Sequence, residues 1–188
     1  MTTAFDDGAI ASDGTSGADD PTRETLTWEG FGVASRELTA QIVRSGWMPD
    51  LIIAIARGGL LPAGAISYAM GVKAMGTMNV EFYTGIGETL EEPQLLPPLM
   101  DVSAMFGKKV LVVDDVADSG KTLKMVMDLI DTHGLSLDGT TAVQVDARSA
   151  VIYEKPRSIL HPDYVWQITD RWINFPWSTR PVITAADV

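Results

Sequence analysis

The residues best suited to chemistry are concentrated between positions 110 and 123, in the stretch VLVVDDVADSGKTL. Aliphatic residues lead into the adjacent acids Asp114 and Asp115, and a third acid, Asp118, precedes a Ser-Gly-Lys-Thr run. Carboxylates accept hydrogen bonds from vicinal hydroxyls, whereas backbone N–H groups that open a helix bind phosphate. A phosphorylated ribose carries both kinds of group. The stretch therefore predicts a sugar diol on Asp114 and Asp115, with the 5-phosphate on the loop that follows.

Two other interpretations of this stretch are weaker. Gly120-Lys121-Thr122 matches the end of the nucleotide-binding pattern G-x-x-x-x-G-K-[ST], but its first glycine would fall at position 115, which is Asp115. A plain helix start with an acid at the positive end of the helix dipole would account for one aspartate. It would not account for two adjacent aspartates at the end of a strand, because like charges repel.

The elements that must position these residues alternate between strands and helices. LIIAIA (51–56) and VLVVDD (110–115) are short runs dominated by aliphatic residues, typical of strands buried on both faces. This alternation predicts an α/β fold with a mostly parallel sheet flanked by helices. We expect helices near 27–46, 60–71 and 120–134, further strands at 73–83, 140–147, 150–156 and 163–169, and a long loop at 84–107.

A second special loop, Arg57-Gly58-Gly59, follows the first of these strands directly. Ligands of parallel α/β sheets bind beyond the carboxyl ends of the strands. Because the acidic loop also leaves the carboxyl end of a strand, we expect both loops to face one crevice.

Composition narrows the possible partners. The net charge of −11 argues against nucleic acid and against an anionic membrane surface, which both require clustered Lys and Arg. The chain has no Cys, which excludes disulfides and fits a cytoplasmic location, and no apolar run approaches the ~18 residues of a membrane helix. We expect a disordered acidic tail at 1–22, one domain at 23–180, and a short C-terminal tail at 181–188.

The acidic stretch resembles the phosphoribosyl pyrophosphate (PRPP) motif of the type I phosphoribosyltransferases: aliphatic strand, two acids, a short loop, then a T/S-G-x-T run. Ile55 to Gly59 looks like the pyrophosphate loop of that family, which often has a non-proline cis peptide, here at Ala56–Arg57. Tyr153 to Pro156 and RWINFPW (171–177) are similar to the lysine-proline turn and the base-covering hood of the bacterial xanthine-guanine enzymes. Trp172 and Trp177 are expected to belong to a lid rather than a strand.

The resemblance implies a type I phosphoribosyltransferase fold with a hood near 155–180 and transfer of ribose 5-phosphate from PRPP to a 6-oxopurine. Asp118 would be the catalytic acid–base group near N7 of the base. Lys155 would donate to the oxygen at C6, Trp172 would stack on the purine, and Ile173 would bind the edge of the base through its backbone. Mg²⁺ is the implied cofactor, with Asp115 as its ligand. The implied PRPP contacts are Arg57, Gly58, Gly59, Asp114, Asp115, Val116, Ala117, Asp118, Ser119, Gly120, Lys121 and Thr122.

One departure from the family leaves alternatives open. Residues 81–107 contain no Lys or Arg, although the flexible loop of the bacterial relatives carries a basic residue that reaches the pyrophosphate. A neighbouring subunit of a homo-oligomer, a dimer or a tetramer, could supply this charge, Lys73 or Tyr83 could substitute for it, or turnover could be weak. The other two hypotheses are a non-catalytic sensor of PRPP or nucleotides and a phosphoribosyltransferase for another base.

Overall fold

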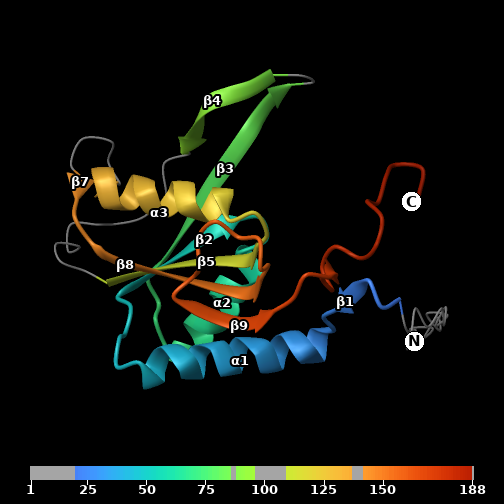
Figure 1. Ribbon diagram of the computed structural model, residues 1–188, viewed down its shortest axis with the longest axis horizontal. Coiled ribbons are helices and arrows are strands. Elements are labelled where there is room, and N and C mark those ends of the chain that lie inside the picture. Colours follow the sequence, from blue (N-terminus) through green and yellow to red (C-terminus); the bar gives the residue numbers. More distant parts are fainter. Residues whose placement is uncertain (1–19, 86–87, 96–108, 137–141, 188) are drawn as a thin grey trace, which may run out of the picture.

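A six-stranded sheet forms the centre of the protein in the computed structural model, which describes residues 20–85, 88–95, 109–136 and 142–187 (Figure 1). The strand order is β4-β3-β2-β5-β8-β9; β3 and β4 pair antiparallel, and every other neighbouring pair is parallel. This is the predicted α/β architecture. The strands are β2 (Leu51–Ala56), β3 (Met75–Gly85), β4 (Glu88–Leu95), β5 (Lys109–Ala117), β8 (Asp146–Glu154) and β9 (Tyr164–Ile168).

In the described part of the chain, three helices cover the two faces of the sheet: α1 (Trp28–Arg44) and α2 (Leu60–Met70) lie on one side and α3 (Lys121–His133) on the other (Figure 1). Alternate residues of β2 pack against the helices on opposite faces of the sheet. Ile53 packs in the cluster that includes α3, and Ile52 packs in the cluster that includes α1 and α2. The continuous apolar run of β2 therefore follows from burial on both faces, because side chains alternate along a strand.

The first helix shows how local sequence sets the element boundaries. Thr27 caps its N-terminus, since its side-chain oxygen accepts a hydrogen bond from the N–H of Gly30 at 3.0 Å. Ala34, Leu38 and Ile42, which recur every four residues, are all fully buried. That spacing predicts one apolar helix face, and the structure confirms it.

A small hood sits beyond the carboxyl edge of the sheet. It contains β1 (Arg23–Thr25) and β10 (Trp172–Asn174), which pair in parallel, and a third apolar cluster that includes Tyr153 and Phe175. Trp177 stacks on Phe175 with ring centroids 4.9 Å apart. The expectation of a lid instead of a strand is wrong here, because residues 172–174 form β10 and Trp177 packs against the cluster.

Two sequence-based boundaries also need correction. The expected loop at 84–107 is wrong in its first part, since β3 runs to Gly85 and β4 returns beside it; residues 96–108 lie outside the described residues. The strand expected at 140–147 is also misplaced. Within the described residues, β7 (Ala142–Val143) pairs with β6 (Leu135–Ser136), and the long strand β8 begins only at Asp146.

Nothing in the described part of the chain resembles a membrane span: none of its helices combines the necessary length with the necessary apolar character. Residues 1–19 of the expected acidic tail lie outside the described residues.

Candidate active site

The loops that follow β2 and β5 meet at the carboxyl edge of the sheet. The two strands are parallel neighbours, with Ala54 opposite Val113, so the loops that follow them leave the sheet at the same edge. A Cβ atom added to Gly58 would lie 2.4 Å from Cγ of Asp115, and one added to Gly59 would lie 2.2 Å from the carbonyl oxygen of Val113. Position 59 therefore requires glycine, because the added atom would overlap backbone, whereas a side chain at position 58 would displace the carboxylate of Asp115. The close approach places the carboxylate of Asp115 directly against the predicted pyrophosphate loop.

The turn that carries Arg57 is tight. The Ala56–Arg57 peptide bond is cis, as the resemblance implies, and the N–H of Gly59 donates to the carbonyl of Ile55 at 2.9 Å. The side chain of Arg57 is exposed at this edge. A guanidinium in this position is free to meet an anionic ligand that approaches the two loops.

The two adjacent acids are in a poorly solvated environment. The backbone N–H of Asp115 donates to Oδ1 of Asp114 at 2.9 Å, and Asp114 is buried. Burial, followed by the charge of Asp115, raises the pKa of Asp114 well above its usual value. Burial also raises the pKa of Asp115 to about 6. Burial makes the ionised carboxylates of Asp114 and Asp115 unfavourable, so a cation bound next to them would stabilise them.

The described residues contain no group of three or more acidic or histidine side chains arranged to enclose a metal ion. Mg²⁺ commonly binds through one or two carboxylates while water and ligand phosphates fill its other positions. The pair of Asp114 and Asp115 matches this kind of incomplete protein site.

The predicted phosphate loop, residues 118–122, leads into the N-terminus of α3. Gly120 has φ of +73°, a left-handed conformation that favours glycine, and a Cβ atom there would lie 2.3 Å from Oγ of Ser158. The carbonyl of Ser119 accepts a hydrogen bond from the N–H of Ile159 at 3.0 Å. The turn after β8 therefore supports this loop. The N–H of Lys121 lies 3.4 Å from Oγ of Ser119, and the N–H groups that open α3 have no partner within the helix, which suits a phosphate.

A cleft of about 460 Å³ opens between this loop and the hood, a volume suited to a small-molecule ligand. It brings together the four residues predicted to act on the base: Asp118, Lys155, Trp172 and Ile173. Trp172 is 68% exposed, so its ring is accessible for stacking. The other lining residues are Val116, Arg157, Asp170, Asn174, Phe175, Ser178 and Thr179.

Lys155 is held at both ends. Its backbone N–H donates to the carbonyl of Ala117 at 3.0 Å, and its ammonium donates to the carbonyl of Arg171. Burial lowers the pKa of Lys155, while the carboxylate of Asp118 acts in the opposite direction. An ammonium has three N–H donors and no acceptor. Lys155 can therefore bind an oxygen on a ligand while it keeps its contact with the hood.

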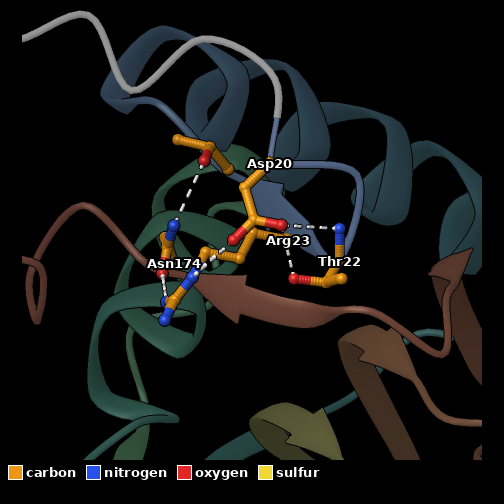
Figure 2. A network of polar contacts seen from close by, with 5 residues as sticks. Asp20, Thr22, Arg23 and Asn174 are labelled. Carbon is orange, nitrogen blue, oxygen red and sulfur yellow. Dashed lines mark hydrogen bonds and ion pairs between the residues drawn. The ribbon is translucent and has the colours of Figure 1, made fainter.

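The hood strand β10 is fixed by the N-terminal strand β1. Figure 2 shows the carboxylate of Asp20 between Thr22 and Arg23, and the guanidinium of Arg23 donating to Oδ1 of Asn174 at 2.9 Å. The side-chain N–H of Asn174 lies 3.4 Å from Oγ1 of Thr25. Because Asn174 also lines the cleft, the position of the cleft wall depends on residues more than 140 positions earlier in the chain.

Five polar residues of the cleft are absent from the sequence-based prediction: Arg157, Asp170, Asn174, Ser178 and Thr179. Arg157 follows the predicted lysine-proline turn and Asp170 precedes the predicted hood. Proximity to those motifs is the one feature of the sequence that could have indicated these two residues as part of the site. The ion pair of Arg157 with Asp118 joins residues 39 positions apart. No spacing pattern reports such a contact.

A second hollow, of about 480 Å³, is lined by residues of β1 and its surroundings and contains none of the predicted site residues. Its charged groups are already paired: Arg23 with Asp20, and Arg171 with Glu24 at 3.7 Å. The cleft between the hood and the phosphate loop is therefore the better candidate for chemistry.

Comparison with known proteins agrees with this arrangement. A family model described as the phosphoribosyl transferase domain matches residues 22–183. A xanthine-guanine phosphoribosyltransferase of Gluconobacter oxydans is 32% identical over 160 residues, which cover 84% of this chain and 86% of that protein. A second, of Idiomarina loihiensis, is 29% identical over 155 residues, covering 81% and 84%.

Among solved structures, a purine phosphoribosyltransferase from Pyrococcus horikoshii superposes with a TM-score of 0.67 at 33% identity. The match covers 87% of this chain and 98% of that one. The family match spans both glycine-dependent loops, the acid pair and the hood. This chain belongs to the phosphoribosyltransferase family.

Proposed function

We propose that this protein transfers ribose 5-phosphate from PRPP to N9 of a 6-oxopurine (guanine, xanthine or hypoxanthine) and releases pyrophosphate. One observation carries the proposal: the cleft that holds Asp118, Lys155 and Trp172 adjoins the loop suited to the 5-phosphate. A base in the cleft would thus lie beside the sugar that it attacks. The names of the relatives, xanthine-guanine and purine phosphoribosyltransferase, support the same class of base.

In this proposal the chain binds PRPP at three points. Asp114 and Asp115 accept hydrogen bonds from the ribose hydroxyls, the N–H groups of residues 118–122 bind the 5-phosphate, and Arg57 with the neighbouring glycine N–H groups holds the pyrophosphate. These contacts fix the anomeric carbon opposite the base. The contribution to rate comes mainly from positioning and from charge stabilisation.

The residues of the cleft act on the base. N9 attacks the anomeric carbon as the bond to pyrophosphate breaks, and the carboxylate of Asp118 accepts the proton that the base loses from N7. Lys155 donates to the oxygen at C6, and Trp172 covers the purine face. The amino group of adenine would face the ammonium of Lys155 donor to donor, which disfavours that base.

Mg²⁺ fits the acid pair, since two carboxylates with raised pKa values gain most from a nearby cation. Asp115 is the proposed direct ligand, because its carboxylate lies against the backbone of Gly58 in the pyrophosphate loop. When bound, the ion would neutralise charge on the leaving pyrophosphate.

The structure bears on the missing basic residue of the 81–107 segment. Lys73 lies two residues before β3, which runs parallel to β2 from Met75 onward, so Lys73 is at the amino edge of the sheet. That edge is opposite the predicted pyrophosphate loop, and Lys73 is therefore unsuited to the role. The side chain of Tyr83, the other candidate, lies outside the described residues. We favour a second copy of the chain as the source, and therefore a homo-oligomer.

Helix α2 offers a surface for such an assembly. Leu60, Leu61 and Tyr68 project from it with 42%, 39% and 93% of their surfaces exposed. Sedimentation of the wild type and of Tyr68→Glu would test this interface: a shift to smaller species in the variant supports it, and unchanged sedimentation rules it out.

The reaction itself is tested by substitution of Asp118. Asp118→Asn keeps the size of the side chain but removes its basicity, and should lower turnover ~10²–10⁴-fold. PRPP affinity, measured by calorimetry with Mg²⁺, should change far less. Turnover within about threefold of the wild type would mean that Asp118 is not the acid–base group.

A further inference from the structure

Arg157 is a charged residue of the cleft that the proposed reaction does not yet use. Its guanidinium pairs with Oδ1 of Asp118, and both residues line the cleft together with Lys155. The backbone around Arg157 is well anchored. The N–H of Ser158 donates to the carbonyl of Lys155 at 2.9 Å, and the N–H of Ile159 donates to the carbonyl of Ser119 at 3.0 Å. Arg157 is therefore held beside the phosphate loop by its main chain, while its exposed side chain contacts Asp118.

Stability does not explain this ion pair. The side chains of Arg157 and Asp118 are 68% and 51% exposed, and exposed ion pairs contribute little to folding because solvent screens them. The pair is also easily separated or shared with a ligand. A guanidinium has five N–H donors, so Arg157 can keep its contact with Asp118 and still donate to a second acceptor.

The N7 atom of the purine changes from a hydrogen-bond donor in the base to an acceptor in the nucleotide. Before the reaction, a base that is nucleophilic at N9 carries its proton on N7, and a carboxylate is the matching acceptor. When N9 forms its bond to the anomeric carbon and pyrophosphate leaves with the bonding electrons, the N7 proton passes to Asp118. N7 of the nucleotide then holds a lone pair and needs a donor. In the major groove of DNA, arginine and lysine side chains commonly donate to the O6 and N7 edge of guanine.

We propose that Arg157 is a substrate-contacting residue that donates to N7 of the nucleotide, so that Asp118 and Arg157 form a matched acceptor and donor for the two states of this atom. The inference rests on the proposed function, since it assumes a 6-oxopurine in the cleft. It assigns Arg157 mainly to nucleotide binding and to the reverse reaction, and Asp118 mainly to the base.

The test pairs a protein variant with an altered ligand. Guanosine 5′-monophosphate and its 7-deaza analogue, in which a C–H group replaces N7, are titrated by calorimetry into the wild type, Arg157→Met and Arg157→Lys. We expect the wild type to bind the natural nucleotide at least tenfold more tightly than the analogue. Arg157→Met should reduce the ratio of the two affinities, natural nucleotide over analogue, to less than twofold. Arg157→Lys, which retains a single cationic donor group, should give an intermediate ratio.

Controls separate this inference from the function on which it rests. Arg36→Met removes an exposed arginine of α1 outside the cleft and should leave the ratio at its wild-type value. The Michaelis constant for guanine should change less than threefold in Arg157→Met, because the base form carries its N7 proton. An unchanged ratio in Arg157→Met, as expected if protonated Asp118 were the donor, would overturn the inference. Absence of nucleotide formation by the wild type would instead overturn the proposed function.

Discussion

Gly58→Ala is a direct test of the contact between the pyrophosphate loop and the acid pair. The new Cβ atom would lie 2.4 to 2.5 Å from the three carboxyl atoms of Asp115. Carbon atoms in contact normally stay about 3.5–4.0 Å apart, so the overlap exceeds ~1 Å. Either the carboxylate must rotate away or the two loops must separate, and both responses displace a group that we assign to PRPP and Mg²⁺.

The expected magnitude follows from this overlap. Forced accommodation of one methyl group in a packed site costs about 1–3 kcal/mol of stability. Loss of a hydrogen bond to a charged group costs about 1.5–3 kcal/mol of binding, which is roughly 10- to 150-fold in affinity. We therefore expect Gly58→Ala to bind PRPP with Mg²⁺ at least tenfold more weakly than the wild type in calorimetry.

Gly64→Ala provides a matched control in the following helix, where an added Cβ atom has nothing within 4 Å. Because alanine favours a helix over glycine by ~0.5–1 kcal/mol, this variant should be slightly more stable in urea denaturation and should bind PRPP normally. If Gly58→Ala bound PRPP within twofold of the wild type, the carboxylate of Asp115 would not be held in a functional position by this loop.

Three further predictions concern the acids, the lysine and the hood. The pKa of Asp115 is raised to about 6 in the folded protein. The stability contributed by its protonated form is therefore fully present below about pH 4 and is lost as the pH rises through 6. Asp115→Asn should raise the urea midpoint relative to wild type at pH 7.5 but not at pH 4. Lys155→Gln should lower kcat/KM for guanine and bring it closer to the value for adenine in a pyrophosphate-release assay. If kcat/KM were unchanged for all four bases (guanine, xanthine, hypoxanthine and adenine), Lys155 would not belong to the base pocket. Asn174→Ala removes the contacts with Arg23 and Thr25, and should raise the Michaelis constant for the base about three- to tenfold, a loss of ~1 kcal/mol, with that for PRPP unchanged.

Short-range patterns were sufficient to predict the centre of the fold. The apolar run of β2 and the aliphatic start of β5 report burial on both faces, and the positions of the two special loops follow from strand direction. Gly58 and Gly59 were predicted as ligand-binding residues, and the structure adds a packing reason for each. The cleft also collects the predicted base residues, whose roles remain proposals.

Elements that depend on distant pairing could not be predicted in this way. Strands β1 and β10 are three residues each and form through pairing across about 149 positions of the chain. Strand β4 contains Pro93, and its position at the edge of the sheet tolerates a residue without an N–H donor. The pair of Arg157 and Asp118 is likewise set by the way two loops meet rather than by any local pattern.

The most direct test of the account is nucleotide formation by the wild type from PRPP, Mg²⁺ and each of guanine, xanthine, hypoxanthine and adenine, followed by mass spectrometry of the product. We predict a nucleoside 5′-monophosphate and stoichiometric pyrophosphate with at least one of the three 6-oxopurines. The kcat/KM for adenine should be lower by a factor of about a hundred or more, since a buried charged donor would face its amino group. PRPP binding without turnover on any base would instead indicate a sensor, and adenine used as well as guanine would contradict the assignment of the cleft.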